Sequence, residues 1–159
     1  MGFWKCVSYL VTTAVLGFVG GRLLPPKWLN PNGWLFRTRA FEEGGRIYEK
    51  LGIRKWQKKV PDMSRIFPKW MPAKNLSGNY KERLPVMIRE TCTAEVVHLA
   101  VGLTGLRCFW LWPGVGGLVI VLIHGVLLNL PFILIQRYNR PRLMKLLQRI
   151  ETGRSMHTL

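Results

Sequence analysis

Long apolar stretches alternate with strongly basic ones along this chain. Cys6 to Gly21 contains no charged residue, and the 25 residues from Leu111 to Ile135 contain no Asp, Glu, Lys or Arg. About 20 consecutive apolar residues are enough to cross the core of a bilayer as a helix. The pattern predicts transmembrane helices over residues 5–24 and 114–135, with Arg22 snorkelling to the membrane surface at the end of the first.

A third span is predicted over residues 94–112, because this stretch is apolar apart from a few polar members. Pro113-Gly114 reads as a tight turn, so spans two and three form a hairpin. Arg107 lies near its outer end, where it anchors the helix. The expected fold is an all-α membrane protein with about three transmembrane helices, an N-terminal span plus a C-terminal hairpin.

The segment 25–90 is expected to consist of short pieces lying in the membrane interface. "PPKWLNPNGW" and "PKWMPAKNLSGNY" are rich in Pro, Asn and Gly and predict turns. Between them, "FEEGGRIYEKLGIRKWQKKVPD" predicts one or two short amphipathic helices. A further amphipathic helix is predicted over residues 141–152, since four apolar residues there follow helical spacing: Leu143, Leu146, Leu147 and Ile150.

Composition agrees with this reading. The chain has 159 residues, of which 48% are hydrophobic, yet its formal net charge is +16. Of its 24 Lys and Arg residues, 16 lie between Arg22 and Glu90 and six follow Ile135. By its length the chain is expected to form a single membrane domain. The positive-inside rule then predicts that the N-terminus lies outside and the C-terminus in the cytoplasm. The expected partners of the charge are anionic lipid headgroups rather than nucleic acid.

The N-terminal stretch is expected to be a retained span rather than a cleaved signal, because no A-x-A-type site follows it. The three cysteines are scattered without C-x-x-C spacing and predict neither a disulfide framework nor a zinc site: Cys6, Cys92 and Cys108. We expect no metal and no cofactor.

If the hairpin folds at Pro113, a residue of span two and a residue of span three lie at the same depth in the membrane when their numbers add up to about 226. Polar residues of both spans then gather at the cytoplasmic side of the membrane: Glu90, Glu95, His98, Asn129, Gln136 and Arg137. Such a patch can hold helices together, or it can be an active site. Spacing alone leaves both readings open. His124 lies mid-span without an acidic partner, and helix contact is expected there.

Two motifs of this chain resemble those of a known protein family. "IRETCTAEVVH" and "NLPFILIQRYNRPRLMKLL", together with the middle segment, resemble the glycosyl-4,4'-diaponeurosporenoate acyltransferases, small bacterial membrane enzymes of the staphyloxanthin pathway type. The resemblance runs from about Trp34 to Ile150. It implies transfer of a fatty acyl group from acyl-CoA or acyl-carrier protein to a sugar hydroxyl of a membrane lipid or glycolipid.

Acyl transfer to a hydroxyl needs a general base, and His is the usual one. We expect His98 to be this base, with Glu95 or Glu90 orienting its ring. Donors to the oxyanion are expected among Asn129, Gln136 and Arg137. The phosphates of the donor are expected to bind Arg137, Arg140 and Arg142.

Three alternatives stay open. Cys92 could act as a covalent nucleophile, although it lies on another face of the helix from His98. Glu95-x-x-His98 has a spacing found in carboxylate-bridged metal sites, but those sites need several more carboxylates. The chain could also be a non-catalytic lipid-binding or scaffold protein.

Overall fold

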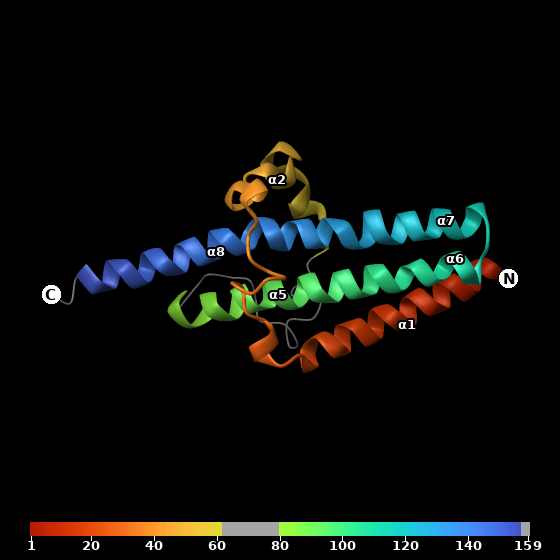
Figure 1. The fold of residues 1–159 in the computed structure, drawn as a ribbon, viewed down its shortest axis with the longest axis horizontal. Coiled ribbons are helices and arrows are strands. Elements are labelled where there is room, and N and C mark those ends of the chain that lie inside the picture. Colours follow the sequence, from red (N-terminus) through yellow and green to blue (C-terminus); the bar gives the residue numbers. More distant parts are fainter. Residues whose placement is uncertain (62–79, 157–159) are drawn as a thin grey trace. The chain divides into compact units, whose positions relative to one another are not determined.

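The computed structural model describes residues 1–61 and 80–156, and all regular structure within these ranges is helical (Figure 1). Three helical stretches are long and apolar enough to cross a membrane: Gly2–Leu23, Lys81–Leu111 and Val115–Gly153. The prediction of an all-α membrane protein with three spans is confirmed. The predicted turns within 68–79 lie outside the described residues.

The chain forms two compact units, and each is described by itself. The apolar unit combines Met1–Trp28 with Thr93–Leu134, and the basic unit combines Leu29–Cys92 with Ile135–Leu159. Two long helices contribute to both units: α5 (Tyr80–Thr104) and α8 (Leu130–Met156).

The apolar unit contains helix α1 (Gly2–Leu23), which ends where Pro25 and Pro26 follow. A residue before proline avoids the helical conformation, and Leu24 is extended, with ψ at 127°. Gly17 and Gly21 of α1 lie close to Val101 and Val97 of α5, where an added Cβ would come within 2.5 Å of either valine. This Gly-x-x-x-Gly spacing lets two helices approach closely without lipid between them.

A tight turn joins α6 (Cys108–Leu111) to α7 (Val115–Leu122), as Pro113-Gly114 predicted. Gly114 has a φ of 95°, which glycine adopts at little cost. The N-terminal end of α1 lies beside this turn (Figure 1), where the rings of Phe3 and Trp112 are 6.1 Å apart. Glycine at position 117 lets α7 pass directly over the Trp112 backbone.

Replacing Gly117 with alanine is expected to destabilise the hairpin by roughly 1–3 kcal/mol. The new Cβ would lie 2.1 Å from the Trp112 carbonyl oxygen, and backbone cannot move aside as a side chain can. Thermal unfolding in detergent measures the effect. Gly20→Ala is the matched control, since nothing lies within 4 Å of its added Cβ. Equal unfolding temperatures for both variants would contradict the packing argument.

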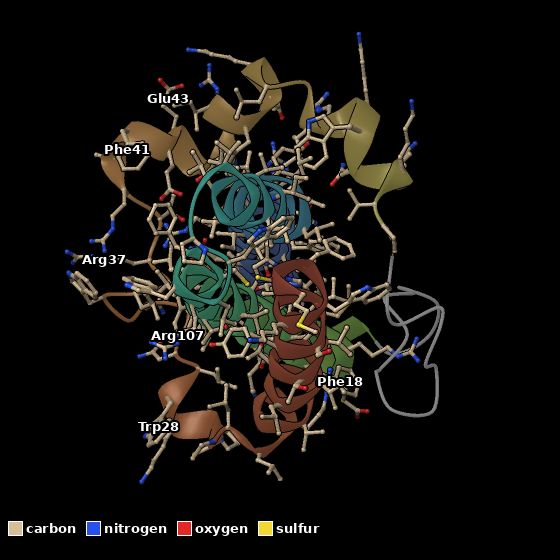
Figure 2. All side chains as sticks on the ribbon, turned by 90° about the vertical axis from the view of Figure 1, so that its right-hand side faces the viewer. Phe18, Trp28, Arg37, Phe41, Glu43 and Arg107 are labelled. Atoms are coloured by element: carbon tan, nitrogen blue, oxygen red, sulfur yellow. The ribbon has the colours of Figure 1, made fainter. Side chains whose placement is uncertain are left out.

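The basic unit contains short helices: the 3₁₀ helix η2 (Ala40–Gly45), α2 (Ile47–Lys50) and α3 (Ile53–Trp56). Gly52 separates α2 from α3 with a φ of 67°. The side chains of Phe41 and Glu43 point away from the ribbon that carries them (Figure 2). Ile53, by contrast, is completely buried.

Helix α8 differs from the prediction of a separate helix over 141–152. It runs without interruption from Leu130 to Met156 and contains Pro141. Proline within a helix removes one backbone N–H and crowds the preceding turn. The guanidinium of Arg142 donates to the Tyr138 carbonyl oxygen at 2.6 Å, so an additional hydrogen bond supports the backbone at this point.

Candidate active site

His98 lies on α5 in the apolar unit and has two neighbours from the other side of the hairpin. Its Nδ1 is 3.1 Å from Oδ1 of Asn129. Its ring is stacked on Phe132, with centroids 4.3 Å apart and planes within 9°. The register predicted from the turn is therefore correct to within a few residues, because His98 meets Asn129 and Phe132.

Nε2 of His98 makes no hydrogen bond to any described residue. Within the same residues, every fully buried side-chain nitrogen or oxygen has a hydrogen-bond partner. Nε2 is therefore not fully buried, while Nδ1 is occupied. An imidazole held in this way can take a proton from a group that approaches Nε2.

Asn129 connects His98 to a second histidine. Its Nδ2 donates to the backbone oxygen of His124 at 2.8 Å and lies 3.2 Å from Nε2 of the same residue. That Nε2 is 3.0 Å from the carbonyl oxygen of Val101. His124 and Asn129 are both buried, so the apolar unit contains a buried polar network.

Two glycines of α5 and the turn after it make room for this network. An added Cβ at Gly105 would lie 2.3 Å from Cδ2 of His124, and one at Gly102 would lie 3.4 Å from Cβ of Asn129. His124 and Asn129 lie in the segment η5 (Ile123–Asn129), which is a π-helix. Such segments are rare, and they occur often at functional sites.

Glu95, one helical turn before His98, is only 2% exposed. The hydrogen bond of His98 goes to Asn129, so Glu95 does not hold Nδ1 of the imidazole. Asn129 lies in the apolar unit, as do Glu95 and His98. The other predicted residues lie in the basic unit: Glu90, Gln136 and Arg137.

In the basic unit, Arg137 is bound by a buried carboxylate that the sequence did not single out as a site residue. Its Nη1 lies 3.2 Å from Oε1 of Glu42, and its Nη2 donates to the Leu35 carbonyl at 2.7 Å. Glu42 is 1% exposed. It also accepts from the Tyr48 hydroxyl and from the Arg39 backbone.

Burial by itself raises the pKa of Glu42. Hydrogen bonds from the Arg39 backbone and the Tyr48 hydroxyl, together with the Arg137 guanidinium, outweigh burial and hold the pKa of Glu42 below its ordinary value. A carboxylate with a lowered pKa contributes stability above its ordinary pKa, and this contribution is lost as the pH falls through the folded-state value.

We expect the basic unit to loosen in acid below about pH 4.5, because protonation of Glu42 weakens its bond to Arg137. Limited proteolysis between pH 3 and 7 would follow the loss. Glu42→Gln is expected to weaken the unit at neutral pH and to reduce its acid sensitivity. The control is Glu43→Gln, whose carboxylate is exposed. An unchanged acid response in Glu42→Gln would contradict this assignment.

The other two predicted phosphate ligands are also engaged. Arg140, only 1% exposed, donates to the Phe36 carbonyl at 2.7 Å and to Oγ1 of Thr91 at 2.9 Å. Arg142 forms an ion pair with Glu49, and its guanidinium lies over the Tyr138 ring. Arg54 also binds Glu49, at 2.8 Å.

Sequence reasoning expected His98 and Asn129 to lie near each other, and their side chains are in contact, but it gave His124 no part in this cluster. The spacing of five residues between His124 and Asn129 signals no shared face in an ordinary α-helix, and only the π-helix brings them together. Within the described residues, no group of three His, Cys, Asp or Glu side chains could hold a metal ion.

Comparison with known proteins gives the family. The sequence profile of the glycosyl-4,4'-diaponeurosporenoate acyltransferases matches residues 31–149. Proteins of that name from Staphylococcus aureus strains MRSA252 and USA300 are each 26% identical to this chain over 156 residues, which cover 98% of this chain and 93% of theirs. No solved structure matches it significantly. The chain is thus a member of the glycosyl-4,4'-diaponeurosporenoate acyltransferase family.

Proposed function

We propose that this protein is an integral membrane O-acyltransferase that moves a fatty acyl group from a thioester donor to a sugar hydroxyl of a membrane glycolipid. The observation that carries the proposal is the imidazole of His98, whose Nδ1 is bonded and whose Nε2 is not fully buried and makes no hydrogen bond to any described residue. The names of the relatives indicate a glycosylated carotenoid acid as the kind of acceptor to test first.

His98 acts as the general base in this proposal. Nε2 removes the proton of the sugar hydroxyl while the hydroxyl oxygen attacks the thioester carbonyl carbon. The tetrahedral intermediate then collapses, the carbon–sulfur bond breaks, and His98 returns the proton to the leaving thiolate. The products are the ester and the free thiol, and the base is regenerated.

Glu95 is proposed to support the imidazolium that forms during the reaction. It lies one turn before His98 on the same helix, where a carboxylate favours a nearby positive charge. The oxyanion needs separate donors. Gln136 and Arg137 remain proposed for this role, whereas the amide of Asn129 is directed at His98 and His124.

The donor phosphates are proposed to bind cations of the basic unit. Arg140 is buried, so Arg142, which is more exposed, is the better of the predicted candidates. Three exposed lysines follow helical spacing: Lys55, Lys58 and Lys59. Phosphate esters of a donor or of a lipid headgroup fit this surface. We also propose that the basic unit and the C-terminus are cytoplasmic, with the N-terminus outside.

The test is direct. Purified protein in lipid would receive labelled acyl-CoA or acyl-carrier protein together with a glycosylated carotenoid acid or a glycolipid extract, and thin-layer chromatography with mass spectrometry would follow the label. A labelled ester is expected. No ester from folded protein with any donor would favour the lipid-binding or scaffold reading.

A further inference from the structure

The protons of the buried network can be placed from its fixed acceptors. A backbone carbonyl oxygen accepts hydrogen bonds and never donates. Nε2 of His124 faces the carbonyl oxygen of Val101 at 3.0 Å, so it must carry a proton. His124 is therefore the Nε2–H tautomer.

The same reasoning orients the amide of Asn129. The atom that lies 2.8 Å from the backbone oxygen of His124 has to be the nitrogen, because only the nitrogen can donate. Nδ2 of Asn129 also lies 3.2 Å from Nε2 of His124. Both nitrogens carry hydrogen, and each of them donates to a carbonyl oxygen. The amide oxygen of Asn129 consequently faces His98.

The third step fixes His98. Its Nδ1 lies 3.1 Å from an amide oxygen, which only accepts, so Nδ1 carries the proton. A neutral imidazole has one N–H, and the lone pair is then on Nε2. We propose that Asn129 is a positioning residue that sets the tautomer of His98 and thereby makes Nε2 the catalytic base. Its catalytic meaning rests on the proposed acyltransfer.

An amide suits this role within an apolar unit. In hydrolases with a Ser-His-Asp triad a carboxylate orients the imidazole, and in papain-like enzymes an asparagine takes its place. A buried carboxylate without a partner is costly in an apolar surrounding, whereas an amide carries no charge. Asn129 can therefore orient the ring through geometry alone.

The backbone holds Asn129 in place. It ends the π-helix η5, whose wider turn brings its side chain back onto the oxygen of His124 five residues earlier. Gly102 lies against its Cβ, and Gly105 lies against the His124 ring. The tautomer of His98 thus depends, through Asn129, on the backbone oxygen of His124.

Nitrogen NMR of histidine-labelled protein in lipid tests the proton positions without any activity. The shift of a protonated ring nitrogen differs from that of an unprotonated one, and His98→Asn assigns the signals. We expect the neutral His98 to carry its proton on Nδ1 and His124 to carry it on Nε2. In Asn129→Leu, we expect His98 to become a mixture of both tautomers. A wild-type His98 protonated on Nε2 would overturn the proposal.

Kinetics give the second readout. Asn129→Leu is expected to lower kcat on the order of 10²–10⁴-fold with little change in KM, as loss of the orienting residue does in triad enzymes. Asn129→Asp is expected to restore most of kcat, since a protonated carboxyl group can donate to the His124 oxygen and accept from Nδ1 of His98. Thr13→Val is the matched control, because that hydroxyl bonds only to the backbone of its own helix.

The possible results distinguish the positioning role of Asn129 from the proposed acyl transfer. Equal kcat for Asn129→Leu and wild type, or equal losses in the Leu and Asp variants, would overturn the positioning role. A wild type that transfers no acyl group but shows the expected tautomers would refute the acyltransfer and leave the proton placement standing.

Discussion

Replacing His98 with asparagine is expected to reduce acyl transfer by about 10²–10⁴-fold, the range that a general base contributes. The asparagine amide can still donate to Oδ1 of Asn129, as Nδ1 of the imidazole does. It offers no basic nitrogen at the position of Nε2. The variant therefore removes the base while keeping a hydrogen-bond donor for its neighbour, and ester formation from a labelled donor measures the loss.

Phe132→Leu is the companion variant, since it removes the ring stacked on His98 but leaves the imidazole in place. A decrease of a few-fold is expected, because an aromatic pair contributes about 0.5–1.5 kcal/mol. Wild-type rates in His98→Asn, measured on protein of unchanged thermal stability, would exclude this residue as the base.

The membrane architecture could be predicted because hydrocarbon leaves the chain few choices. The backbone must satisfy its own hydrogen bonds there, and apolar stretches of sufficient length become helices. The turn at Pro113-Gly114 then sets the pairing of the hairpin, which is why His98 could be placed opposite the region of Asn129. The continuity of α8 through Pro141 could not be predicted, because local sequence favours a break there.

The details of the site depend on contacts that local sequence does not encode. Glu95 has the spacing to share a helical face with His98, yet Asn129 from the next helix holds the ring. Glu42 binds Arg137 across 95 positions of sequence. Two partly buried arginines and one fully buried arginine look alike in "QRYNRPR", and only the fold distinguishes them. His124 joins the network because a π-helix changes the spacing of one segment.

Replacing Arg140 with methionine is expected to destabilise the basic unit by about 2–5 kcal/mol, the largest stability effect among these variants. The guanidinium donates to the Phe36 carbonyl and to both the hydroxyl and the carbonyl of Thr91, at 2.7, 2.9 and 3.1 Å. Methionine has a similar length and no donor. It therefore leaves backbone oxygens of two distant segments buried without these partners.

Two control variants separate the effect of the shape of the Arg140 guanidinium from the effect of its charge. Arg140→Lys keeps the positive charge, but a single ammonium cannot reproduce the planar fork that reaches Phe36 and Thr91 together, so most of the loss is expected to remain. Arg149→Met removes an exposed charge from the same helix and is expected to change stability by no more than about 0.5 kcal/mol. Protease resistance of the segment Leu29–Val60 in detergent, with thermal unfolding of the full chain, measures each variant. If Arg140→Lys were as stable as wild type, the charge rather than the fork would hold Phe36 and Thr91 together.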